Sequence, residues 1–307
     1  MNLAVKHDDD ATARMHVPVM VGEVRDLLCA HGPRVVVDAT VGTGGHAAAL
    51  LAATDAHLIG IDRDLDALAL ARERLGSFGT RVMLRHADFG DLAAVLRECG
   101  AETVDAMVAD LGMSSFALDD PARGFSFRFD GPLDMRMDRS QRLRAYDLVN
   151  EETEADLADL LHQWGEERAA RRIARSIVEA RRRRPIETTA DLRAIVERVL
   201  GPRRGGGGVH PATRTFQALR IAVNREMESL AAFLESAPAL LSAGGRMAVI
   251  AYHSLEDRAV KERMRALAGG ESFALITRKV IKPADSEVAS NPRARSARLR
   301  ALARVAR

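Results

Sequence analysis

The sequence predicts an α/β fold, a doubly wound parallel sheet that is interrupted by an inserted all-helical domain. Short apolar runs alternate with amphipathic helical segments over residues 34–110, and repeated βαβ units of this length form a parallel sheet. Residues 146–200 then read almost entirely as helix, and the strand pattern resumes at residue 244. We therefore expect one sheet built from both ends of the chain, with the helical segment inserted between them.

Each expected strand is a short apolar run, and each expected helix carries apolar residues at spacings of three and four. The expected strands are 34–40, 57–62, 81–89, 103–110, 244–254, 273–281 and 296–305. The expected helices of the α/β domain are 47–53, 64–75, 91–99 and 254–268. Ser254 would cap the last of these, with Asp257 closing a capping box. A single long amphipathic helix is expected over residues 213–241.

The domain boundaries are expected where glycine and proline interrupt the regular pattern. Residues 1–14 would form a disordered tail. Residues 15–120 and 212–307 would together form the α/β domain, and residues 121–211 the helical insertion. The glycine-rich run at 201–208 would be one of the two connections of that insertion.

Composition and charge narrow the class of protein. The 307 residues are 47% hydrophobic and 29% charged, contain no apolar run of about 20 residues, and begin without a secretory signal pattern. Cys29 and Cys99 lack a CxxC spacing, so a cytoplasmic protein without a structural zinc site is expected. The net charge of +2 conceals two basic blocks, 166–184 and 278–307. Such blocks favour contact with a polyanion, and the alternative is a solvated helix face and a loose tail.

A glycine-rich turn follows the first expected strand and opens a helix. Gly42-Thr43-Gly44-Gly45-His46-Ala47 fits the pattern G-x-G-x-x-A of nucleotide-binding turns. Asp62 ends the second strand 18 residues after Gly44, where an acceptor for ribose hydroxyls belongs. No Gly-Lys-Ser/Thr follows, which excludes a P-loop. The turn by itself fits both NAD and S-adenosylmethionine.

Acidic side chains at the other strand ends favour the second cofactor. Asp38 precedes the turn, and a carboxylate there would repel a pyrophosphate by roughly 4 kcal/mol at about 4 Å and an effective dielectric of 20. The ammonium of S-adenosylmethionine would instead pair with it; a turn cap is the alternative role. Phe89 could pack on an adenine ring, although ordinary core packing fits it equally. Asp110 lies at the rim where open sheets bind ligands.

Four later motifs carry a resemblance to a known family. They are GFSFRFDGPLDMRMD at 124–138, HPATRTFQALR at 210–220, YHSLEDRAVK at 252–261 and NPRARSARLR at 291–300. In this order they closely resemble the bacterial small-subunit (16S) ribosomal RNA cytosine-N4 methyltransferase family. The resemblance implies a class I, Rossmann-like, S-adenosylmethionine-dependent methyltransferase with a helical insertion. The implied substrate is a cytosine at the P site of the decoding centre, and the implied partner is 16S rRNA, either free or in the small ribosomal subunit.

The resemblance also assigns residues. The cofactor contacts that it implies fall on Gly44, Gly45, His46, Asp62, Phe89 and Asp110, to which the reading of the turn adds Asp38 and Gly42. The family pattern DLGVSSPQLD stands here as DLGMSSFALD, so Ala117 replaces a glutamine that contacts the cofactor in relatives. No membrane contact and no bound metal are expected, and both a monomer and a homodimer stay open.

The residues fit transfer to nitrogen rather than to carbon. Carbon methylation of cytosine normally uses a cysteine nucleophile, and neither cysteine lies at the sheet rim. Nitrogen methylation needs no covalent intermediate, only acceptors that hold the amine in line with the methyl group. The expected catalytic set is Asp110, Ser114, Tyr252 and His253. An NAD-dependent oxidoreductase and a non-catalytic RNA-binding protein are the two rival readings.

Contacts to RNA are expected from aromatic and basic residues. The sequence lacks the D/N/S-P-P-Y/F tetrapeptide whose aromatic ring stacks on a flipped base, so another ring must do so. Phe116, Phe125, Phe127 and Phe129 are the candidates, with loop packing as the alternative, and Phe125 and Phe127 are taken as the substrate contacts. Further candidates are His210, Arg214, Arg293 and Arg295, with simple surface charge as the alternative.

Overall fold

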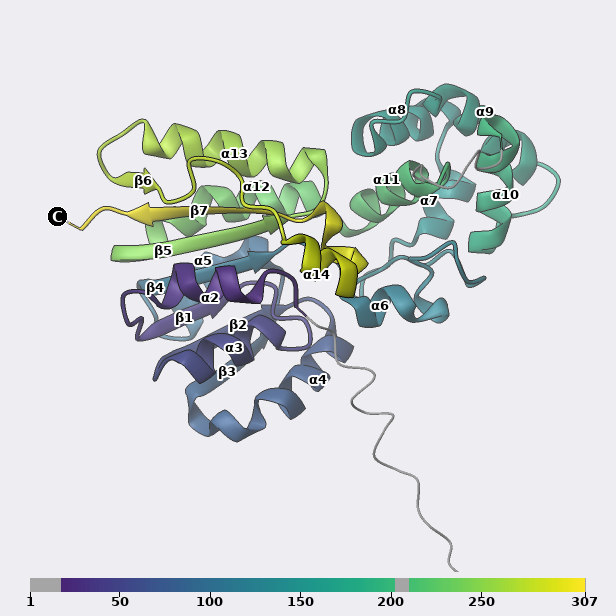
Figure 1. The fold of residues 1–307 in the computed structure, drawn as a ribbon. Helices are drawn as coiled ribbons and strands as arrows, with labels where there is room; N and C mark the ends of the chain where they lie inside the picture. Colours follow the sequence, from purple (N-terminus) through teal and green to yellow (C-terminus); the bar gives the residue numbers. More distant parts are fainter. Residues whose placement is uncertain (1–17, 202–209, 307) are drawn as a thin grey trace, which may run out of the picture. The chain divides into compact units, whose positions relative to one another are not determined.

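A computed structural model describes residues 18–201 and 210–306, and its chain divides into two compact units (Figure 1). The α/β unit contains the residues up to Phe116 and those from Glu228 onward, and the helical unit is Ala117–Met227. The expected tail at 1–14 and most of the glycine-rich run at 201–208 lie outside the described residues. Within the described part of the chain, no helix is long and apolar enough to cross a membrane.

The α/β unit is built on a seven-stranded sheet with the order β3-β2-β1-β4-β5-β7-β6 (Figure 1). The strands are β1 Val35–Asp38, β2 His57–Asp62, β3 Val82–His86, β4 Val104–Asp110, β5 Leu241–Ala251, β6 Phe273–Leu275 and β7 Arg298–Arg304. Strands β1 to β5 pair in parallel, and β7 runs antiparallel to both β5 and β6. The predicted fold class is confirmed, with one sheet drawn from both ends of the chain.

Helices accompany this sheet and bury its apolar side chains. They are α2 Val21–Cys29, α3 Gly45–Ala53, α4 Leu65–Leu75, α5 Leu92–Glu98, α12 Glu226–Ser236, α13 Ser254–Ala268 and α14 Asp285–Ser290. The core is aliphatic: Val36, Leu58 and Val108 from the strands and Leu50 from α3 are each at most 1% exposed. A parallel strand covered on both faces requires this continuous apolar character.

The helical unit contains α7 Ala145–Glu151, α8 Glu154–Gly165, α9 Ala170–Arg181, α10 Thr189–Leu200 and α11 Thr213–Asn224, and α6 Ser115–Asp119 spans its first boundary. Helix α8 packs against both α9 and α11. Gly165 permits one of these contacts, because a Cβ there would lie 2.7 Å from the Arg214 carbonyl oxygen. Leu161 and Ile173 are fully buried in the resulting core.

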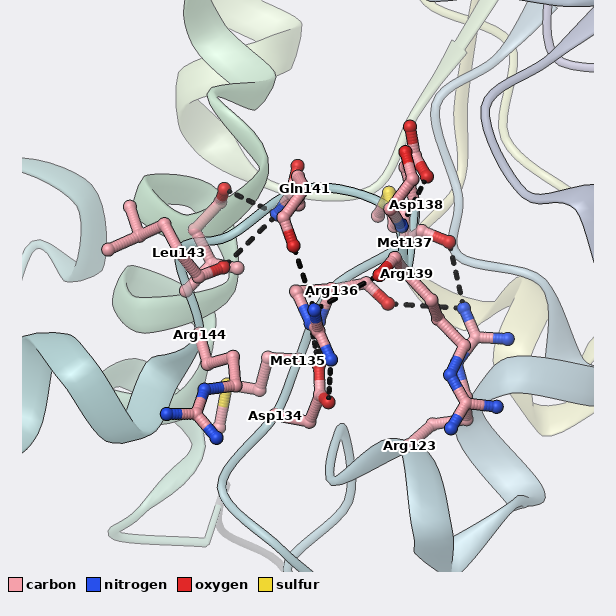
Figure 2. Close-up of polar contacts among 12 residues, drawn as sticks. Arg123, Asp134, Met135, Arg136, Met137, Asp138, Arg139, Gln141, Leu143 and Arg144 are labelled. Atoms are coloured by element: carbon pink, nitrogen blue, oxygen red, sulfur yellow. Dashed lines mark hydrogen bonds and ion pairs between the residues drawn. The ribbon is translucent and has the colours of Figure 1, made fainter.

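A network of polar contacts fixes the loop that precedes α7 (Figure 2). The buried Arg123 guanidinium donates to the carbonyl oxygens of Arg136 and Met137 at 3.1 and 2.9 Å. The Asn224 amide donates to the Met135 carbonyl and accepts from the Met137 N–H, both at 2.7 Å. These bonds hold Met135 in the left-handed region at φ 60°, a conformation that only a well-supported loop retains.

The single long helix expected over 213–241 is wrong. Helix α11 ends at Asn224, α12 begins at Glu226, and Arg225 between them has a left-handed backbone with φ 50°. Asn224 is the reason at the end of α11, because its side chain is bound to the loop of the helical unit. Amphipathic periodicity continues across such a break and therefore does not reveal it.

Two further details differ from the sequence-based expectation. Residues 212–227 lie in the helical unit rather than in the α/β domain, because α11 packs on α8. The cap of α13 is His253 and not Ser254: its side chain accepts from the Glu256 N–H, and the Glu256 carboxylate closes the capping box. Asp257 instead binds Arg298 and Arg300.

Candidate active site at the carboxyl ends of the parallel strands

Three carboxylates end three neighbouring parallel strands. Asp38 is the last residue of β1, Asp62 of β2 and Asp110 of β4. Strand β1 lies between β2 and β4. The sheet therefore extends from β1 in one direction through β2 and β3, and in the other direction through β4 and β5. In open α/β sheets this switch point, at the carboxyl ends of the strands, is where ligands bind.

The glycine turn after β1 needs its glycines for conformation and for space. Gly42 and Gly44 have φ values of 51° and 83°, in the left-handed region that other residues rarely adopt. A Cβ on Gly45 would lie 2.8 Å from the Pro18 side chain, so the start of α3 packs closely there. Because α3 begins directly after this turn, its first N–H groups lie at the rim of the sheet, where a carboxylate group can bind them.

Asp38 is buried and only partly satisfied. It is 1% exposed; its Oδ1 accepts from the Thr40 N–H at 3.3 Å, and its Oδ2 has no partner among the described residues. Burial raises the pKa of Asp38 to about 7, although His46 and the Thr40 N–H act in the opposite direction. A buried carboxylate oxygen without a partner is costly, so the site favours a cation.

Asp62 ties the second strand to the glycine turn. Its Oδ2 accepts from the Gly42 N–H at 2.7 Å and its Oδ1 from the Asp64 N–H at 2.8 Å. Burial raises the pKa of Asp62 to about 6, against these hydrogen bonds. A carboxylate oxygen has two lone pairs, so each oxygen retains acceptor capacity for a ligand hydroxyl.

Asp110 is the best supplied with donors of the three. His46 Nε2 lies 3.4 Å from Asp110 Oδ2, the Gly112 N–H donates to Oδ1 at 3.2 Å, and the Tyr252 hydroxyl donates to the carboxylate. Burial alone would raise the pKa of Asp110, but these contacts outweigh it and hold the pKa below its ordinary value. The group stays ionised, and the hydrogen bonds from Gly112 and Tyr252 leave its carboxylate further acceptor capacity.

His46 lies between two of the carboxylates and is 6% exposed. Burial alone would lower the pKa of His46, but the carboxylates of Asp110 and Asp38 raise it above its ordinary value. Its Nδ1 has no hydrogen-bond partner among the described residues. A positive imidazole at this place reduces the repulsion between Asp38 and Asp110.

Residues at the end of β5 are engaged with their neighbours. Burial and the Asp110 carboxylate raise the pKa of Tyr252, so its phenol remains a donor and does not act as a base. His253 caps α13, and its Nε2 lies 3.0 Å from Glu256 Oε1. Ser114 has a buried hydroxyl oxygen with no partner among the described residues. Of the expected catalytic set, the structure thus brings together Asp110 and Tyr252.

Phe89 and Asp88 follow the end of β3. The Phe89 ring packs edge to face against Phe233, with ring centroids 5.6 Å apart, and Phe89 is half-buried. Asp88 is occupied: it binds Arg63 at 2.6 Å and accepts from the Ser229 hydroxyl at 2.9 Å. Sequence reasoning missed Arg63 and Ser229, because no motif or spacing marks which distant residue a carboxylate binds.

Comparison with known proteins identifies the family. The model of the MraW methylase family matches residues 13–305. The chain belongs to this family. A Sorangium cellulosum protein named ribosomal RNA small subunit methyltransferase H is 51% identical, over 94% of this chain and 91% of its own length. A protein of the same name from Geobacter sp. strain M21 is 47% identical, over 94% and 98% of the two chains.

The residues of this methylase fit S-adenosylmethionine, its cofactor. The unpartnered Asp38 Oδ2 suits the ammonium group, and the N–H groups that open α3 suit the carboxylate. Asp62 retains acceptor capacity for the ribose hydroxyls. Ala117, where the family resemblance implies a glutamine, is 2% exposed and offers only a methyl group.

The expected RNA contacts in the helical unit of the methylase are largely engaged inside that unit. Phe125 is 6% exposed. Phe127 stacks on His210 with ring centroids 4.5 Å apart and meets Phe216 edge to face. Arg214 is exposed, although it donates to the Glu166 carbonyl oxygen at 3.3 Å.

Two other candidate RNA-contact residues, Phe129 and Arg295, are exposed. Phe129 is 54% exposed, the highest exposure among the aromatic residues considered. Arg295 is exposed on the short helical turn Pro292–Ser296 of the α/β unit, and Arg293 on the same turn is half-buried. These residues retain the ability to contact a large polar substrate.

Proposed function

We propose that the protein transfers a methyl group from S-adenosylmethionine to the exocyclic N4 of a cytosine at the P site of the decoding centre in 16S rRNA. The names of its relatives support ribosomal RNA as the substrate class. The motifs that resemble the cytosine-N4 family support the choice of atom. The observation that carries the proposal is Asp110, an ionised carboxylate at the sheet rim with an acceptor position left over.

The chemistry requires that the amine be held and oriented. S-adenosylmethionine supplies an electrophilic methyl group on a cationic sulfur, which leaves with the electrons of the carbon–sulfur bond. Asp110 accepts one hydrogen of the cytosine N4 amine, which fixes the direction of its nitrogen. When the nitrogen–carbon bond forms, N4 loses one hydrogen as a proton, and Asp110 is the base in contact with it.

Tyr252 and His46 act through Asp110 in this proposal. The Tyr252 hydroxyl donates to its carboxylate and the His46 imidazole lies 3.4 Å from it, so the two side chains orient the carboxylate and keep it ionised. Asp38 would hold the ammonium group of the cofactor and Asp62 its ribose hydroxyls. Phe89 would pack on the adenine ring. The reaction forms no covalent intermediate with the enzyme.

The basic surface supports a polyanionic substrate. Helix α9 and the residues after it carry exposed arginines at 171, 172, 175, 182, 183 and 184. Counterion release on neutralising phosphates makes such a face a strong, salt-sensitive contact for RNA. His210, Arg214, Arg293 and Arg295 remain proposed contacts, and Phe129 replaces Phe127 as the ring we propose to stack on a base. We place the reaction in the cytoplasm, on 16S rRNA either as free RNA or in the small ribosomal subunit.

Mass spectrometry of ribosomal nucleosides tests the proposal. In a strain lacking the gene, N4-methylated cytidine should disappear at one position of 16S rRNA, and the wild-type gene should restore it. A gene carrying Asp110→Asn should not restore it, although the variant should still bind S-adenosylmethionine in calorimetry. Tight binding of NAD in place of S-adenosylmethionine would support an oxidoreductase and overturn the proposal.

A further inference from the structure

A basic pocket lies in the α/β unit between α13 and the strands β6 and β7. The empty space there is about 220 Å³, part of it open to solvent. The lining residues are Lys261, Met264, Arg265, Leu275, Thr277, Arg278 and Arg300. Four of these seven side chains are cationic, and none is acidic. The sheet order places β7 and β6 last, at the opposite edge from β3 (Figure 1).

One of the four cations is neutralised by a neighbouring acid. Arg300 Nε donates to Asp257 Oδ1 at 2.7 Å, and Arg298 binds the other oxygen of the same carboxylate at 3.0 Å. Burial alone would raise the pKa of Asp257, but the two guanidinium groups hold it below its ordinary value. Asp257 is therefore a permanent anion shared by two arginines, and it also fixes Arg300 at the pocket.

The other three cations have no partner in the part of the chain that the structure describes. Among the described residues, the side chains of Lys261, Arg265 and Arg278 form no hydrogen bond or ion pair. Lys261 and Arg265 are four residues apart on α13 and so share one face of the helix. Thr277 adds a neutral donor: its hydroxyl oxygen accepts from the Ala301 N–H at 2.8 Å, which leaves its own hydrogen available.

This set of donors matches a phosphate group. Guanidinium groups bind phosphate oxygens in pairs, and an ammonium group and a hydroxyl complete a shell of donors without any acceptor. The apolar side chains of Met264 and Leu275 line the same pocket and lower its local dielectric, which strengthens the attraction for an anion.

The pocket belongs to the same unit as the candidate active site. Helix α13 begins directly after Tyr252 and His253, at the end of β5. Lys261 lies about two turns further along α13, or roughly 11 Å along the helix axis. A nucleic acid whose target base reaches Asp110 therefore has neighbouring phosphates at a comparable distance.

We propose that this basic pocket binds a backbone phosphate of the RNA substrate, outside the nucleotide that is methylated. The inference rests on the proposed function, since it takes RNA as the substrate. It assigns Lys261, Arg265 and Arg278 to substrate binding and gives them no part in the chemistry.

Charge removal with a matched control tests the pocket. The test variant is Lys261→Gln/Arg278→Gln, and the control is Arg72→Gln/Arg97→Gln, which removes two exposed positive charges from α4 and α5. The probe is a fluorescently labelled fragment of the 16S decoding region, whose binding is followed by anisotropy over a range of salt concentrations. Methyl transfer to the same RNA is measured in parallel.

The expected result is about a tenfold weaker affinity and a tenfold higher KM for the RNA at moderate salt, with kcat unchanged. The slope of log K against log salt should fall by about 1, whereas the control should behave as the wild type. Affinity and slope equal to the control would overturn the pocket assignment while the methyl-transfer proposal stands. If the wild-type protein transfers no methyl group, the proposed function fails, and the difference in salt slope still decides whether the pocket binds RNA.

A second measurement separates RNA from a free anion. Thermal unfolding is followed with increasing inorganic phosphate for the wild type and the double variant. Stabilisation of the wild type alone, together with unchanged RNA binding by the variant, would assign the pocket to a free phosphate compound and overturn the RNA assignment.

Discussion

The two units of the molecule use their polar residues in opposite ways. At the rim of the α/β unit, Asp38 and His46 are buried and retain atoms without partners. In the loop of the helical unit, the Arg136 guanidinium binds the Asp134 carboxylate (Figure 2). The Asn224 side chain binds the backbone of Met135 and Met137 in the same loop. Buried carboxylate and imidazole atoms with free hydrogen-bonding capacity at a sheet rim mark a place prepared for a ligand, whereas side chains bound to the backbone of a neighbouring loop mark a scaffold.

The comparison separates two kinds of sequence motif. The glycine turn and the strand-end acids are short, and their residues face a site. The motif at 124–138 is longer and equally specific as a sequence pattern. Two of its backbone carbonyl groups nevertheless accept hydrogen bonds from the preceding Arg123, and these bonds hold a loop. A motif thus indicates that the residue types at its positions are restricted. Only the hydrogen-bond partners of its polar atoms tell whether the restriction serves ligand binding or the fold.

Removal of the Asp110 charge should have the largest effect. Asp110→Asn keeps the size of the side chain but loses the acceptor that faces the amine, so kcat should fall by about 10²–10³-fold. Binding of S-adenosylmethionine should change much less, as measured by calorimetry. Asp55→Asn, at an exposed residue between α3 and β2, is the control and should keep full activity. Equal loss of binding and turnover would show that Asp110 only supports the fold.

Removal of Arg123 should disturb the other unit instead. Arg123 is 2% exposed, and Arg123→Met removes the donor of two partly buried carbonyl oxygens. The free energy of unfolding should fall by about 2–4 kcal/mol. Denaturant unfolding measures this loss, and calorimetry should show that cofactor binding persists in the α/β unit. Arg128→Met, at an exposed residue of the same loop, is the control. A loss of cofactor affinity as large as that of Asp38→Asn would contradict the assignment of Arg123 to the scaffold.

The raised pKa of Asp38, about 7, predicts a pH dependence of cofactor binding. The ammonium group needs the ionised carboxylate, so the Kd for S-adenosylmethionine should rise about tenfold as the pH falls from 8 to 6. Calorimetry over this range measures it, and Asp38→Asn should bind weakly at every pH. The stability of the cofactor-free protein should change with pH in the opposite direction. The folded protein holds the Asp38 proton more tightly than the unfolded chain does, so the free energy of unfolding should fall as the pH rises from about 4 to 7.

Sequence periodicity could predict most of the sheet but not the boundaries between units. Expected strand 57–62 matches β2, and expected strand 103–110 differs from β4 by one residue, because buried parallel strands are continuous apolar runs. The break at Arg225 was missed, since both helices carry the same apolar periodicity on either side of it. Only the contact of Asn224 with a distant loop explains it.

The candidate site likewise contains residues that could be placed from the sequence and contacts that could not. Asp38, Asp62 and Asp110 could be placed from the sequence because parallel strands bring their carboxyl ends to one edge. The cap formed by His253 and the contact of Glu256 with it could not, since they depend on the angle at which α13 leaves β5. The internal stack of Phe127 on His210 joins residues far apart in the chain and has no sequence signal.

A pair of phenylalanine substitutions gives the smallest and most discriminating test of the comparison. Phe129→Ala removes an exposed ring, so stability should change by less than about 0.5 kcal/mol. If the ring stacks on a base, the KM for the RNA substrate should rise at least about fivefold, since stacking contributes roughly 1–3 kcal/mol. Phe127→Ala removes a ring that packs on His210 and Phe216, and it should cost about 3 kcal/mol of stability instead. Kinetics and denaturant unfolding of both variants decide the matter: a stable Phe127→Ala variant with a raised KM would exchange the two roles.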